Sequence, residues 1–470
     1  MIVPSSSVHN HHAHSAYYRL VLIDSLGFFG ACYLAVYLYF LPQPGGWAEF
    51  VNHIPIRALV FSAVSVTSLM AMGLYQPRMR EGASGVVLRT AGAFTVVLLT
   101  MALVFYLAPS LHLWRGIFLY TTAVAFVFSL SSRLVFTHFS DFEQLKTQTL
   151  VYGAGQAANT IITTMRRKSD RQGFALVGFV AAEGEEVAVP ENQIINITVP
   201  LAQYVTDNNI DQIVMALDDK RTLTPVDELI ESRMKGVEII DLVHFFQLQA
   251  GKILVDYITP SWLIYADGFQ SDTRSMIRKR AFDLVTSFLL LMATWPIMLL
   301  TVVAIWIEDG MTAPIVFRQS RVGLHGKVFQ VLKFRSMTVD AEGDGKARWA
   351  TKNDSRVTKV GRFIRKVRID ELPQIINVLA GEMAFTGPRP ERPEFVKELA
   401  QKIPFYDVRH SVKPGITGWA QLCYPYGADE SDAKQKLQFD LYYVKNHSLF
   451  LDFIILLTTV EVILFGKGAR

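Results

Sequence analysis

Four long apolar segments open the chain, and they decide its fold class because segments of this length belong in a lipid bilayer. They lie near 18–41, 57–75, 87–108 and 117–137. Each approaches the roughly 20 residues that an α-helix needs to cross the hydrocarbon core. Asp24 lies inside the first segment, so we expect it to face neighbouring helices and not lipid. The sequence predicts a four-helix transmembrane bundle over 17–140.

Basic residues in the connections predict the orientation of this bundle. The connections on one side carry Arg78, Arg80, Arg133 and Lys146, against Arg57 and Arg115 on the other. By the positive-inside rule, this bias places both ends of the bundle in the cytoplasm. Residues 1–16 before it are polar and contain four histidines. We expect a flexible tail there, because nothing nearby would fix the ligand geometry of a metal site.

A Rossmann-like α/β domain is predicted over 146–265. The strand 147–152 leads into a turn with Gly153 and Gly155 and then a helix to about residue 165. Further strands are expected at 175–181 and 213–216, with a helix at 226–234. Gly153 and Gly155 are a weak nucleotide-turn candidate, because Ala158 replaces the third glycine of the dinucleotide fingerprint, although alanine is tolerated there. A tight turn in a structural or regulatory domain is the alternative.

A fifth apolar patch, 281–307, is long enough to span the membrane, yet both of its flanks are basic. Residues Arg274, Arg278, Lys279 and Arg280 precede it, and Arg318, Arg321, Lys327, Lys333 and Arg335 follow. A spanning helix is not expected to be positive on both sides. Pro296 lies in the middle of the patch and favours a kink. These features predict a re-entrant helix at about 281–307, with an ordinary kinked span as the alternative.

The last apolar segment, 437–465, mixes charged residues with aromatics. Asp440, Lys445 and Asp452 interrupt it, and its aromatic residues suit headgroup depth. We predict an interfacial segment, with a final span as the alternative.

Two adjacent carboxylates, Asp370 and Glu371, stand between arginine-bearing segments in the last third of the chain. Carboxylates hold divalent cations or attack phosphorus, and arginine forks bind phosphate oxygens. Arg365 precedes the pair, and Arg389 follows it in a Gly-Pro-Arg-Pro turn that the prolines stiffen. This combination predicts phosphoryl-transfer chemistry at a membrane.

The residues around the pair predict the start of a helix with Asp370 as N-cap and Pro373 in the first turn. Such an N-terminus suits phosphate. The same pattern is typical of an Asp370 that only caps and a Glu371 that only complements the helix dipole. The surrounding arginines favour the functional interpretation.

A second basic region holds Gln319, Arg321, Lys333 and Arg335. It is suited to a lipid phosphate or a nucleotide; simple attraction to lipid headgroups is the alternative.

These segments together resemble the bacterial sugar transferases, the polyprenyl-phosphate glycosyl-1-phosphate transferases of surface and exopolysaccharide synthesis. The resemblance covers about 275–470 and rests on motifs in one order. They are Lys279-Arg280-x-x-Asp283, Gln319-x-Arg321-x-Gly323, Lys333-Phe-Arg-Ser-Met337, Arg365-x4-Asp370-Glu371-Leu-Pro-Gln374, Gly387-Pro-Arg-Pro390 and Lys413-Pro-Gly-Ile-Thr-Gly-Trp419. The four spans and the Rossmann-like insert look like the long-form members. Details near the C-terminus look closest to the subgroup associated with exosortase systems.

The resemblance implies a role for each matching residue. Asp370 aligns with the nucleophile that attacks a UDP-sugar, and Glu371 with the Mg²⁺-associated carboxylate, so both are the expected metal ligands. Phosphate or substrate binding is implied for Arg365, Arg389, Lys333, Arg335, Arg321 and Gln319. Lys279, Arg280 and Asp283 match the start of the re-entrant helix, and Pro296 matches its break. Thr386 departs from the commonest pattern, which has Val, and little effect is expected.

The resemblance also implies the setting. The expected partners are a UDP-sugar, polyprenyl (undecaprenyl) phosphate and membrane lipid, with UMP and a polyprenyl-diphospho-sugar as products. The expected location is the bacterial inner membrane, multi-pass, with the catalytic domain cytoplasmic. A homodimer is left open. The fold class is therefore a membrane α-helical bundle, a Rossmann-like α/β domain and a mixed α/β catalytic domain with a re-entrant membrane helix.

Other functions are weaker interpretations of this chain. The alternative is a membrane-anchored nucleotide-binding sensor or scaffold with an inactive transferase domain. A net charge of +4 gives no signal for nucleic acid. Cys32 lies in an apolar segment and Cys423 does not, so we expect no disulfide between them.

Overall fold

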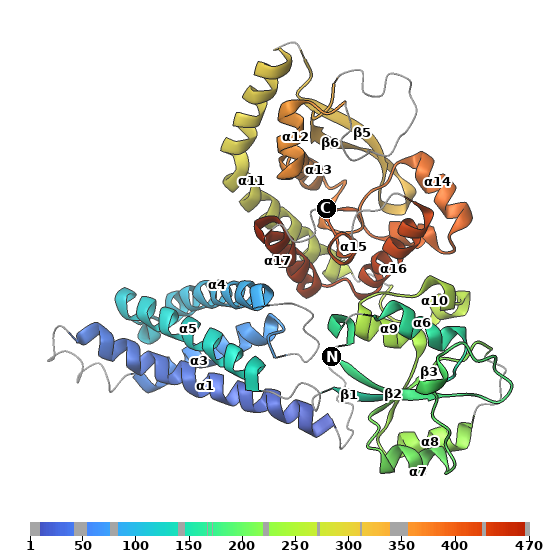
Figure 1. Cartoon of the computed structure of the whole chain (residues 1–470). Coiled ribbons are helices and arrows are strands. Elements are labelled where there is room, and N and C mark those ends of the chain that lie inside the picture. The colour runs from blue at the N-terminus through green and yellow to red at the C-terminus, as the bar shows by residue number, and fades with distance from the viewer. Residues whose placement is uncertain are drawn as a thin grey trace. The chain divides into compact units, whose positions relative to one another are not determined.

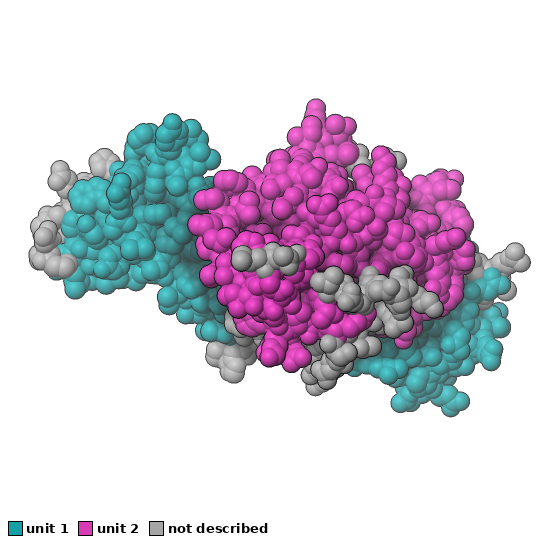
Figure 2. All heavy atoms as spheres, turned by 90° about the horizontal axis from the view of Figure 1, so that it is seen from above, with its two compact units in different colours: residues 1–250 teal, residues 251–470 magenta. Residues whose placement is uncertain are grey.

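A computed structural model of the chain describes residues 10–41, 54–75, 83–139, 146–166, 168–171, 173–219, 225–269, 273–310, 313–338, 356–424 and 429–465. The chain divides into two compact units, 1–250 and 251–470, which Figure 2 shows in two colours. Residues 251–265, which the sequence assigned to the Rossmann-like domain, belong to the second unit. Cys32 is buried and Cys423 is half-buried.

The apolar N-terminal segments form four helices. They are α1 (Asn10–Phe40), α3 (Ile54–Ala71), α4 (Ala83–Leu107) and α5 (Arg115–Phe139), with a short 3-10 turn η1 (Pro109–Leu111) between the last two (Figure 1). Each contains a stretch long and apolar enough to cross a membrane. Since α1 begins at Asn10, residues 10–16 are helical and not a flexible tail. His9, Arg78 and Arg80 lie outside the described residues.

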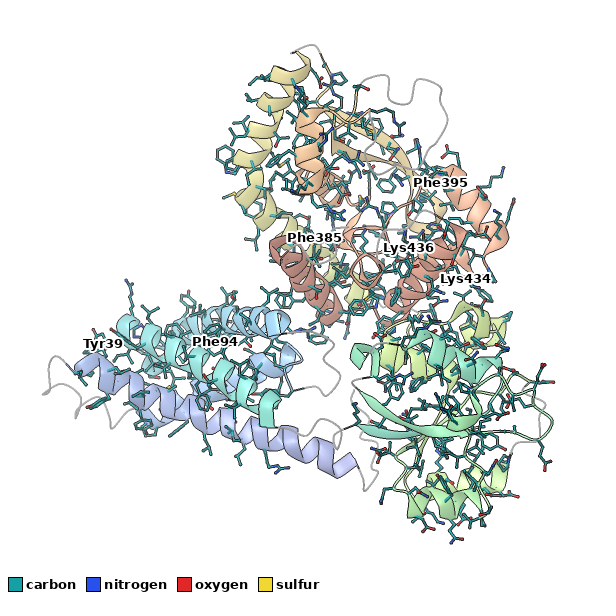
Figure 3. The ribbon with its side chains drawn as sticks, viewed as in Figure 1. Tyr39, Phe94, Phe385, Phe395, Lys434 and Lys436 are labelled. Carbon is teal, nitrogen blue, oxygen red and sulfur yellow. The ribbon has the colours of Figure 1, made fainter. Side chains whose placement is uncertain are left out.

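Asp24 is fully buried among these helices, as the sequence predicted. Its carboxylate accepts hydrogen bonds from Tyr75 Oη at 2.6 Å and Ser132 Oγ at 2.9 Å, and it pairs with Arg133 at 3.1 Å. A charged group in an apolar environment is tolerated when it is paired in this way. Aromatic contacts complete the packing; for example, Phe94, which Figure 3 labels, packs edge-to-face against Phe28.

The Rossmann-like part is a four-stranded parallel sheet with strand order β2-β1-β3-β4. Its elements are β1 (Thr147–Tyr152), α6 (Gln156–Thr164), β2 (Phe174–Val180), α7 (Leu201–Asp207), β3 (Gln212–Met215), α8 (Val226–Met234), β4 (Glu238–Asp241) and α9 (Leu242–Ala250), with 3-10 turns η2 (Lys168–Arg171) and η3 (Glu191–Gln193). The predicted strands and helices are confirmed. The sequence missed β4, α7 and α9, of which β4 has only four residues.

The second unit is a mixed α/β domain (Figure 1). It contains η4 (Val255–Tyr257), α10 (Pro260–Tyr265), α11 (Thr273–Asp309), β5 (Val316–Val322), η5 (Leu324–Gly326), β6 (Val328–Phe334), α12 (Lys359–Lys366), η6 (Ile369–Glu371), α13 (Gln374–Ala380), β7 (Ala384–Thr386), α14 (Pro393–Lys402), η7 (Tyr406–Ser411), β8 (Gly415–Thr417), α15 (Trp419–Cys423), α16 (Glu430–Asn446) and α17 (Leu449–Phe465). Strands β5 and β6 pair antiparallel, and β7 pairs with β8 in parallel.

Both ends of helix α11 are held by the second unit. The helix has 37 residues, includes Pro296, and is long and apolar enough to cross a membrane. Near its start, Asp283 accepts a hydrogen bond from the backbone N–H of Phe385 in β7 at 3.0 Å. At its end, Glu308 accepts from the first backbone N–H groups of α12, and Asp309 pairs with Arg335 at 2.6 Å. Both ends of α11 are thus attached to the same unit, the helix is continuous through Pro296, and its re-entrant path stays a prediction.

The segment 437–465 is two helices, so the prediction of one interfacial segment is wrong for its first half. Helix α16 packs into the core of the unit, and α17 follows after His447 and Ser448. Asp440 and Asp452 are 2% and 1% exposed. They interrupt the apolar pattern because they pair with the buried Arg409 and the half-buried Lys279, and not because they face the headgroups.

Candidate active site

Asp370 and Glu371 lie in the 3-10 turn η6, and both residues are buried, at 8% and 9% exposure. The residue before this turn, Arg368, has a left-handed backbone with φ of 61°. Asp370 is therefore not the N-cap of a helix. Helix α13 starts later, with Pro373 at its N-cap position and no side-chain cap. The interpretation of Asp370 as a simple capping residue is wrong.

Three cations surround the carboxylate of Glu371. Arg389 Nη2 lies 2.9 Å and Lys333 Nζ 3.2 Å from Oε1, and Arg368 Nη1 lies 3.7 Å from Oε2. Burial alone would raise the pKa of Glu371, but these three positive charges outweigh burial and hold its pKa well below the usual range. Glu371 is therefore a fixed anion that organises the cations around it.

Asp370 has the opposite character. Its Oδ1 atom is buried and accepts no hydrogen bond from the part of the chain that the structure describes. Burial raises the pKa of Asp370, and the charge of Glu371 adds to this, while Lys333, Arg365 and Arg389 oppose it. Two neighbouring acids with pKa values driven apart are typical of catalytic pairs with different roles. A carboxylate oxygen without a partner is available to react or to bind a cation.

The loop 387–391 carries Arg389 to the pair and is tightly held. Gly387 joins it to the β7–β8 pair, since its N–H donates to the carbonyl of Thr417 at 2.9 Å. A Cβ on Gly387 would lie 2.4 Å from the carbonyl oxygen of Lys413, so only glycine fits this close approach. Figure 3 labels Phe385 on β7, two residues before this loop. The rigidity expected from the flanking prolines therefore comes also from strand pairing.

The predicted phosphate-binding residues divide into two groups. Lys333 and Arg389 contact Glu371, and the charge of Arg365 acts on Asp370. Arg335, Arg321 and Gln319 point their polar groups elsewhere. Arg335 pairs with Asp309. Arg321 donates to Gln319 Oε1 at 2.6 Å and to the carbonyl of Pro390 at 3.0 Å. These contacts support the walls of the site.

The residues that open α11 form a buried polar cluster with the C-terminal helices. Lys279 Nζ pairs with Asp283 at 3.1 Å and with Asp452 of α17 at 2.9 Å, and it also binds Thr386. Tyr443 of α16 donates to Asp452 at 2.7 Å. Beside this cluster, Arg280 donates to the carbonyls of Val378 and Leu379 at the end of α13. These groups attach α11 to β7 and α13, and so to the site.

Sequence reasoning missed several supporting residues. Asn377 joins α13 to β6, because its Nδ2 donates to the carbonyl of Gln330 at 2.7 Å and its Oδ1 accepts from the N–H of Leu332 at 3.0 Å. Arg409 and Asp440 form a buried pair at 2.8 Å. Their spacing in the sequence gives no signal, because the pairs form only through tertiary packing.

The turn at 153–155 differs from a phosphate-binding turn in one respect. Its backbone fits the pattern, since Gly153 has a φ of 122° and Gly155 opens α6. The N–H groups of Ala154, Gln156 and Ala157 are already bonded within the protein, however. Asp218 accepts from the N–H groups of Gln156 at 2.8 Å and Ala157 at 2.6 Å. Glu185 accepts from Ala154 at 2.8 Å and from Asp218 at 3.2 Å.

Comparison with known proteins agrees with this division of the chain. Residues 274–466 match the family model "Bacterial sugar transferase", and residues 70–230 match the model "CoA-binding domain". A similar protein is the UDP-N-acetylgalactosamine-undecaprenyl-phosphate N-acetylgalactosaminephosphotransferase of Aeromonas hydrophila. It is 47% identical over 192 residues, which are 41% of this chain and 45% of that protein.

Two further relatives differ in how much of each chain they share. The uncharacterized sugar transferase EpsL of Bacillus subtilis is 42% identical over 195 residues, 42% of this chain and 91% of that protein. The undecaprenyl-phosphate galactose phosphotransferase of Salmonella typhimurium is 28% identical over 343 residues, 69% of each chain. The chain spans about half the length of the Aeromonas relative, but nearly all of EpsL. The chain therefore belongs to the bacterial sugar transferase family, and it is a membrane protein.

The match to a CoA-binding domain raises the question of whether the 153–155 turn fits the phosphates of such a cofactor. A nucleotide pyrophosphate binds to free N–H groups at a helix N-terminus. Here the carboxylates of Glu185 and Asp218 take these N–H groups. The residues present do not fit the cofactor. The alternative of a nucleotide-binding sensor, which needs an open turn, gains no support.

A divalent cation fits the acidic pair better. No group of three or more metal-ligating side chains occurs among the residues that the structure describes. Mg²⁺ commonly takes one or two protein carboxylates and completes its shell with substrate phosphate and water. The unpartnered Oδ1 of Asp370 is suited to this kind of site.

Proposed function

We propose that this chain transfers a sugar-1-phosphate from a UDP-sugar to undecaprenyl phosphate, releasing UMP and forming an undecaprenyl-diphospho-sugar. The observation that carries the proposal is the buried, unpartnered carboxylate oxygen of Asp370 beside an anion that holds three cations. Family membership and the names of the relatives, which include glucose, galactose and N-acetylgalactosamine transferases, support it.

The reaction proceeds in two displacements. An oxygen of Asp370 attacks the phosphorus that carries the sugar, a P–O bond to it forms, and the P–O bond to the uridylyl phosphate breaks, so that UMP leaves. A phosphate oxygen of undecaprenyl phosphate then attacks the same phosphorus, and the bond to Asp370 breaks. A covalent intermediate divides one difficult displacement into two easier ones. The raised pKa of Asp370 makes it a more basic, and so more reactive, carboxylate.

The cations offset the repulsion between an anionic nucleophile and anionic substrates. Glu371 holds Arg389, Lys333 and Arg368 next to Asp370, so that their remaining N–H groups can meet phosphate oxygens without a large rearrangement. Asp370 and Glu371 would hold Mg²⁺. When bound, the ion would stabilise the charge on the transferred phosphoryl group and on the leaving UMP.

The lipid substrate needs an apolar surface near Asp370, and one groove in the second unit includes the preceding residue, Ile369, in its lining. The groove has a volume of about 520 Å³ and lies between α11 and α12. Its lining includes Leu300 and Ala304 of α11, Phe363 of α12, and Ile369, the residue before Asp370. We infer that the isoprenyl units next to the lipid phosphate lie here, because Ile369 in its lining is the chain neighbour of Asp370 and α11 is a candidate membrane helix.

The same proposal includes the setting. A re-entrant α11 keeps the site at the headgroup plane of the cytoplasmic face of the inner membrane, where a lipid phosphate and a soluble nucleotide sugar can meet. The reaction would be the first step in building a repeat unit of an exopolysaccharide. The exosortase-associated subgroup and a homodimer stay predictions.

The test is an assay of the purified chain in detergent with undecaprenyl phosphate and a panel of UDP-glucose, UDP-galactose and UDP-N-acetylgalactosamine. We expect Mg²⁺-dependent release of UMP with at least one of them. Incubation without the lipid should leave a hexose-phosphate adduct on the peptide that contains Asp370, detected by mass spectrometry. An active enzyme whose adduct forms on another residue would overturn the nucleophile assignment.

A further inference from the structure

The loop 387–391 is held through its backbone to an unusual degree. Four successive carbonyl groups each accept a hydrogen bond from a different partner. That of Pro388 accepts from the N–H of Gly415 at 3.0 Å, that of Arg389 from Arg409 Nη2 at 2.9 Å, that of Pro390 from Arg321 Nη1 at 3.0 Å, and that of Glu391 from the N–H of Val322 at 2.9 Å. The position of the loop is therefore set by its surroundings and not by its sequence alone.

Arg409 differs from the other partners because it binds the carbonyl of the very residue whose side chain enters the active site. Its side chain is 5% exposed and lies on η7. The same Nη2 atom pairs with Asp440 of α16 at 2.8 Å, and Nη1 donates to Tyr406 Oη at 2.8 Å. Arg409 thus joins the loop, η7 and α16 at one point.

Burying a guanidinium group has an unfavourable desolvation free energy, so the contacts of Arg409 decide whether its side chain stays in one position. Burying an unpaired cation costs several kcal/mol, which the ion pair and the charge-assisted hydrogen bonds must offset. Asp440 is 2% exposed and supplies the opposite charge. Because Arg409 is fixed on two sides by Asp440 and Tyr406, its bond to the carbonyl of Arg389 has a fixed direction.

We propose that Arg409, held by Asp440, is a positioning residue for the transfer reaction: through the backbone carbonyl of Arg389 it keeps the Arg389 guanidinium against Glu371 and beside Asp370. This inference rests on the proposed function for its kinetic consequence, while the geometric part stands by itself. A side chain misplaced by about 1 Å can cost an enzyme on the order of 100-fold in rate. Lysine at position 409 keeps a charge but has one nitrogen in place of two, so it cannot reproduce the contacts of both Nη1 and Nη2 in the same geometry.

The test is a double-mutant cycle with Arg409→Lys and Arg389→Lys. We expect Arg409→Lys to lower kcat by about 10- to 100-fold with a smaller change in KM for the UDP-sugar. If Arg409 acts through Arg389, the double variant is no slower than Arg389→Lys alone. Effects that multiply would overturn the proposal and leave Arg409 with a structural role only.

The matched control is Lys402→Gln. Lys402 also joins two helices of this unit, since it pairs with Glu398 of α14 and Glu430 of α16, but it does so at the surface. The Lys402→Gln variant alone should leave kcat unchanged. Combined with Arg389→Lys, it should give the kcat of Arg389→Lys alone. Should Arg409→Lys not fold, Tyr406→Phe takes its place, because it removes one hydrogen bond from Arg409 and is expected to act in the same direction by a smaller factor.

A second readout does not depend on catalysis. Phenylglyoxal modifies accessible guanidinium groups, and mass spectrometry can follow its reaction at Arg389. If Arg409 keeps the Arg389 guanidinium against Glu371, Arg409→Lys should speed this reaction and Lys402→Gln should leave it unchanged. An unchanged rate at Arg389 in Arg409→Lys would overturn the proposal. If no UDP-sugar yields UMP, the proposed function fails while this comparison still decides the role of Arg409.

Discussion

At the 153–155 turn, two carboxylates fill a site that resembles a phosphate cradle, whereas at the active site three cations gather round one carboxylate and leave its neighbour unpartnered. Glu185 and Asp218 supply the anionic oxygens that a nucleotide would bring to the N–H groups of Ala154 and of the start of α6. Glu371 instead holds Lys333, Arg368 and Arg389 beside Asp370. The comparison teaches that a glycine pattern gives the shape of an anion site, while side chains far away in sequence decide whether it is open.

Replacement of the nucleophile is expected to give the largest effect. Asp370→Asn should lower UMP release by about 10⁴-fold, since an amide cannot form the covalent intermediate. Stability should not fall. The folded-state pKa of Asp370 lies above its ordinary value of 3.8, so its ionisation costs stability as the pH rises above that value, and Asn removes this cost. Thermal unfolding at neutral pH, followed together with the activity assay, measures both; a lower midpoint for the variant would show that Asp370 has a structural partner.

The neighbouring acid should behave in the opposite way. Glu371→Gln leaves Arg389 and Lys333 without their anion and should lower stability by about 1–3 kcal/mol at neutral pH. The folded-state pKa of Glu371 lies below its ordinary value of 4.5, so its stabilisation is present above that pH and is lost as the pH falls. Denaturant unfolding at neutral pH and below pH 4.5 measures the difference between the two proteins.

A surface carboxylate provides the control for this measurement. Glu398→Gln removes one partner of Lys402, in a pair whose side chains are 46% and 62% exposed. Its effect should stay below about 1 kcal/mol, as for other exposed ion pairs. An equal loss for Glu398→Gln and Glu371→Gln would remove the distinction between an organising anion and an ordinary salt bridge.

The two regions also differ in how far the sequence could predict them. The apolar segments, the parallel strands β1 to β3 and the approach of Arg389 to the acidic pair depend on local pattern or on short motifs. The pairs Lys279–Asp452 and Arg409–Asp440, in contrast, join residues far apart in the chain. From the sequence, Asp440 and Asp452 are therefore interpreted as signs of a membrane interface. No local rule distinguishes a buried paired carboxylate from an exposed one.

Thr386 is a second polar group whose environment the local sequence does not reveal. The sequence treated it as a neutral departure from valine. In the structure its side chain is fully buried, and its hydroxyl contacts Lys279, Asp452 and Tyr443. What a hydroxyl contributes depends on the groups that it contacts, and the groups around Thr386 come from α11, α16 and α17.

Acid should weaken the second unit through one buried imidazole. Burial, reinforced by Arg409 and opposed by Asp407, lowers the pKa of His410 from 6.5 to about 4. The unfolded chain therefore binds more protons between these values, and the stability that neutral His410 contributes is lost as the pH falls from about 6.5 to about 4. His410→Phe keeps the ring next to Tyr406 but does not titrate. The stability difference between wild type and variant should change across this window and stay constant above it; a difference that is flat across the window would contradict the assignment.

The smallest effect, an absence of binding, is expected at the 153–155 turn. CoA or ADP should leave hydrogen–deuterium exchange of the peptide over 153–160 unchanged in the full-length protein in detergent. Each ligand would have to displace Glu185 from the N–H of Ala154 and Asp218 from the first N–H groups of α6. Asp218→Ala should speed exchange at Gln156 and Ala157 and cost about 0.5–2 kcal/mol, as for other lost helix caps. Glu186→Ala, beside Glu185, is the control and should change neither. Slower exchange in the wild type on adding CoA would mean that phosphate displaces the carboxylates, and the two regions would then both be anion sites that differ only in what occupies them at rest.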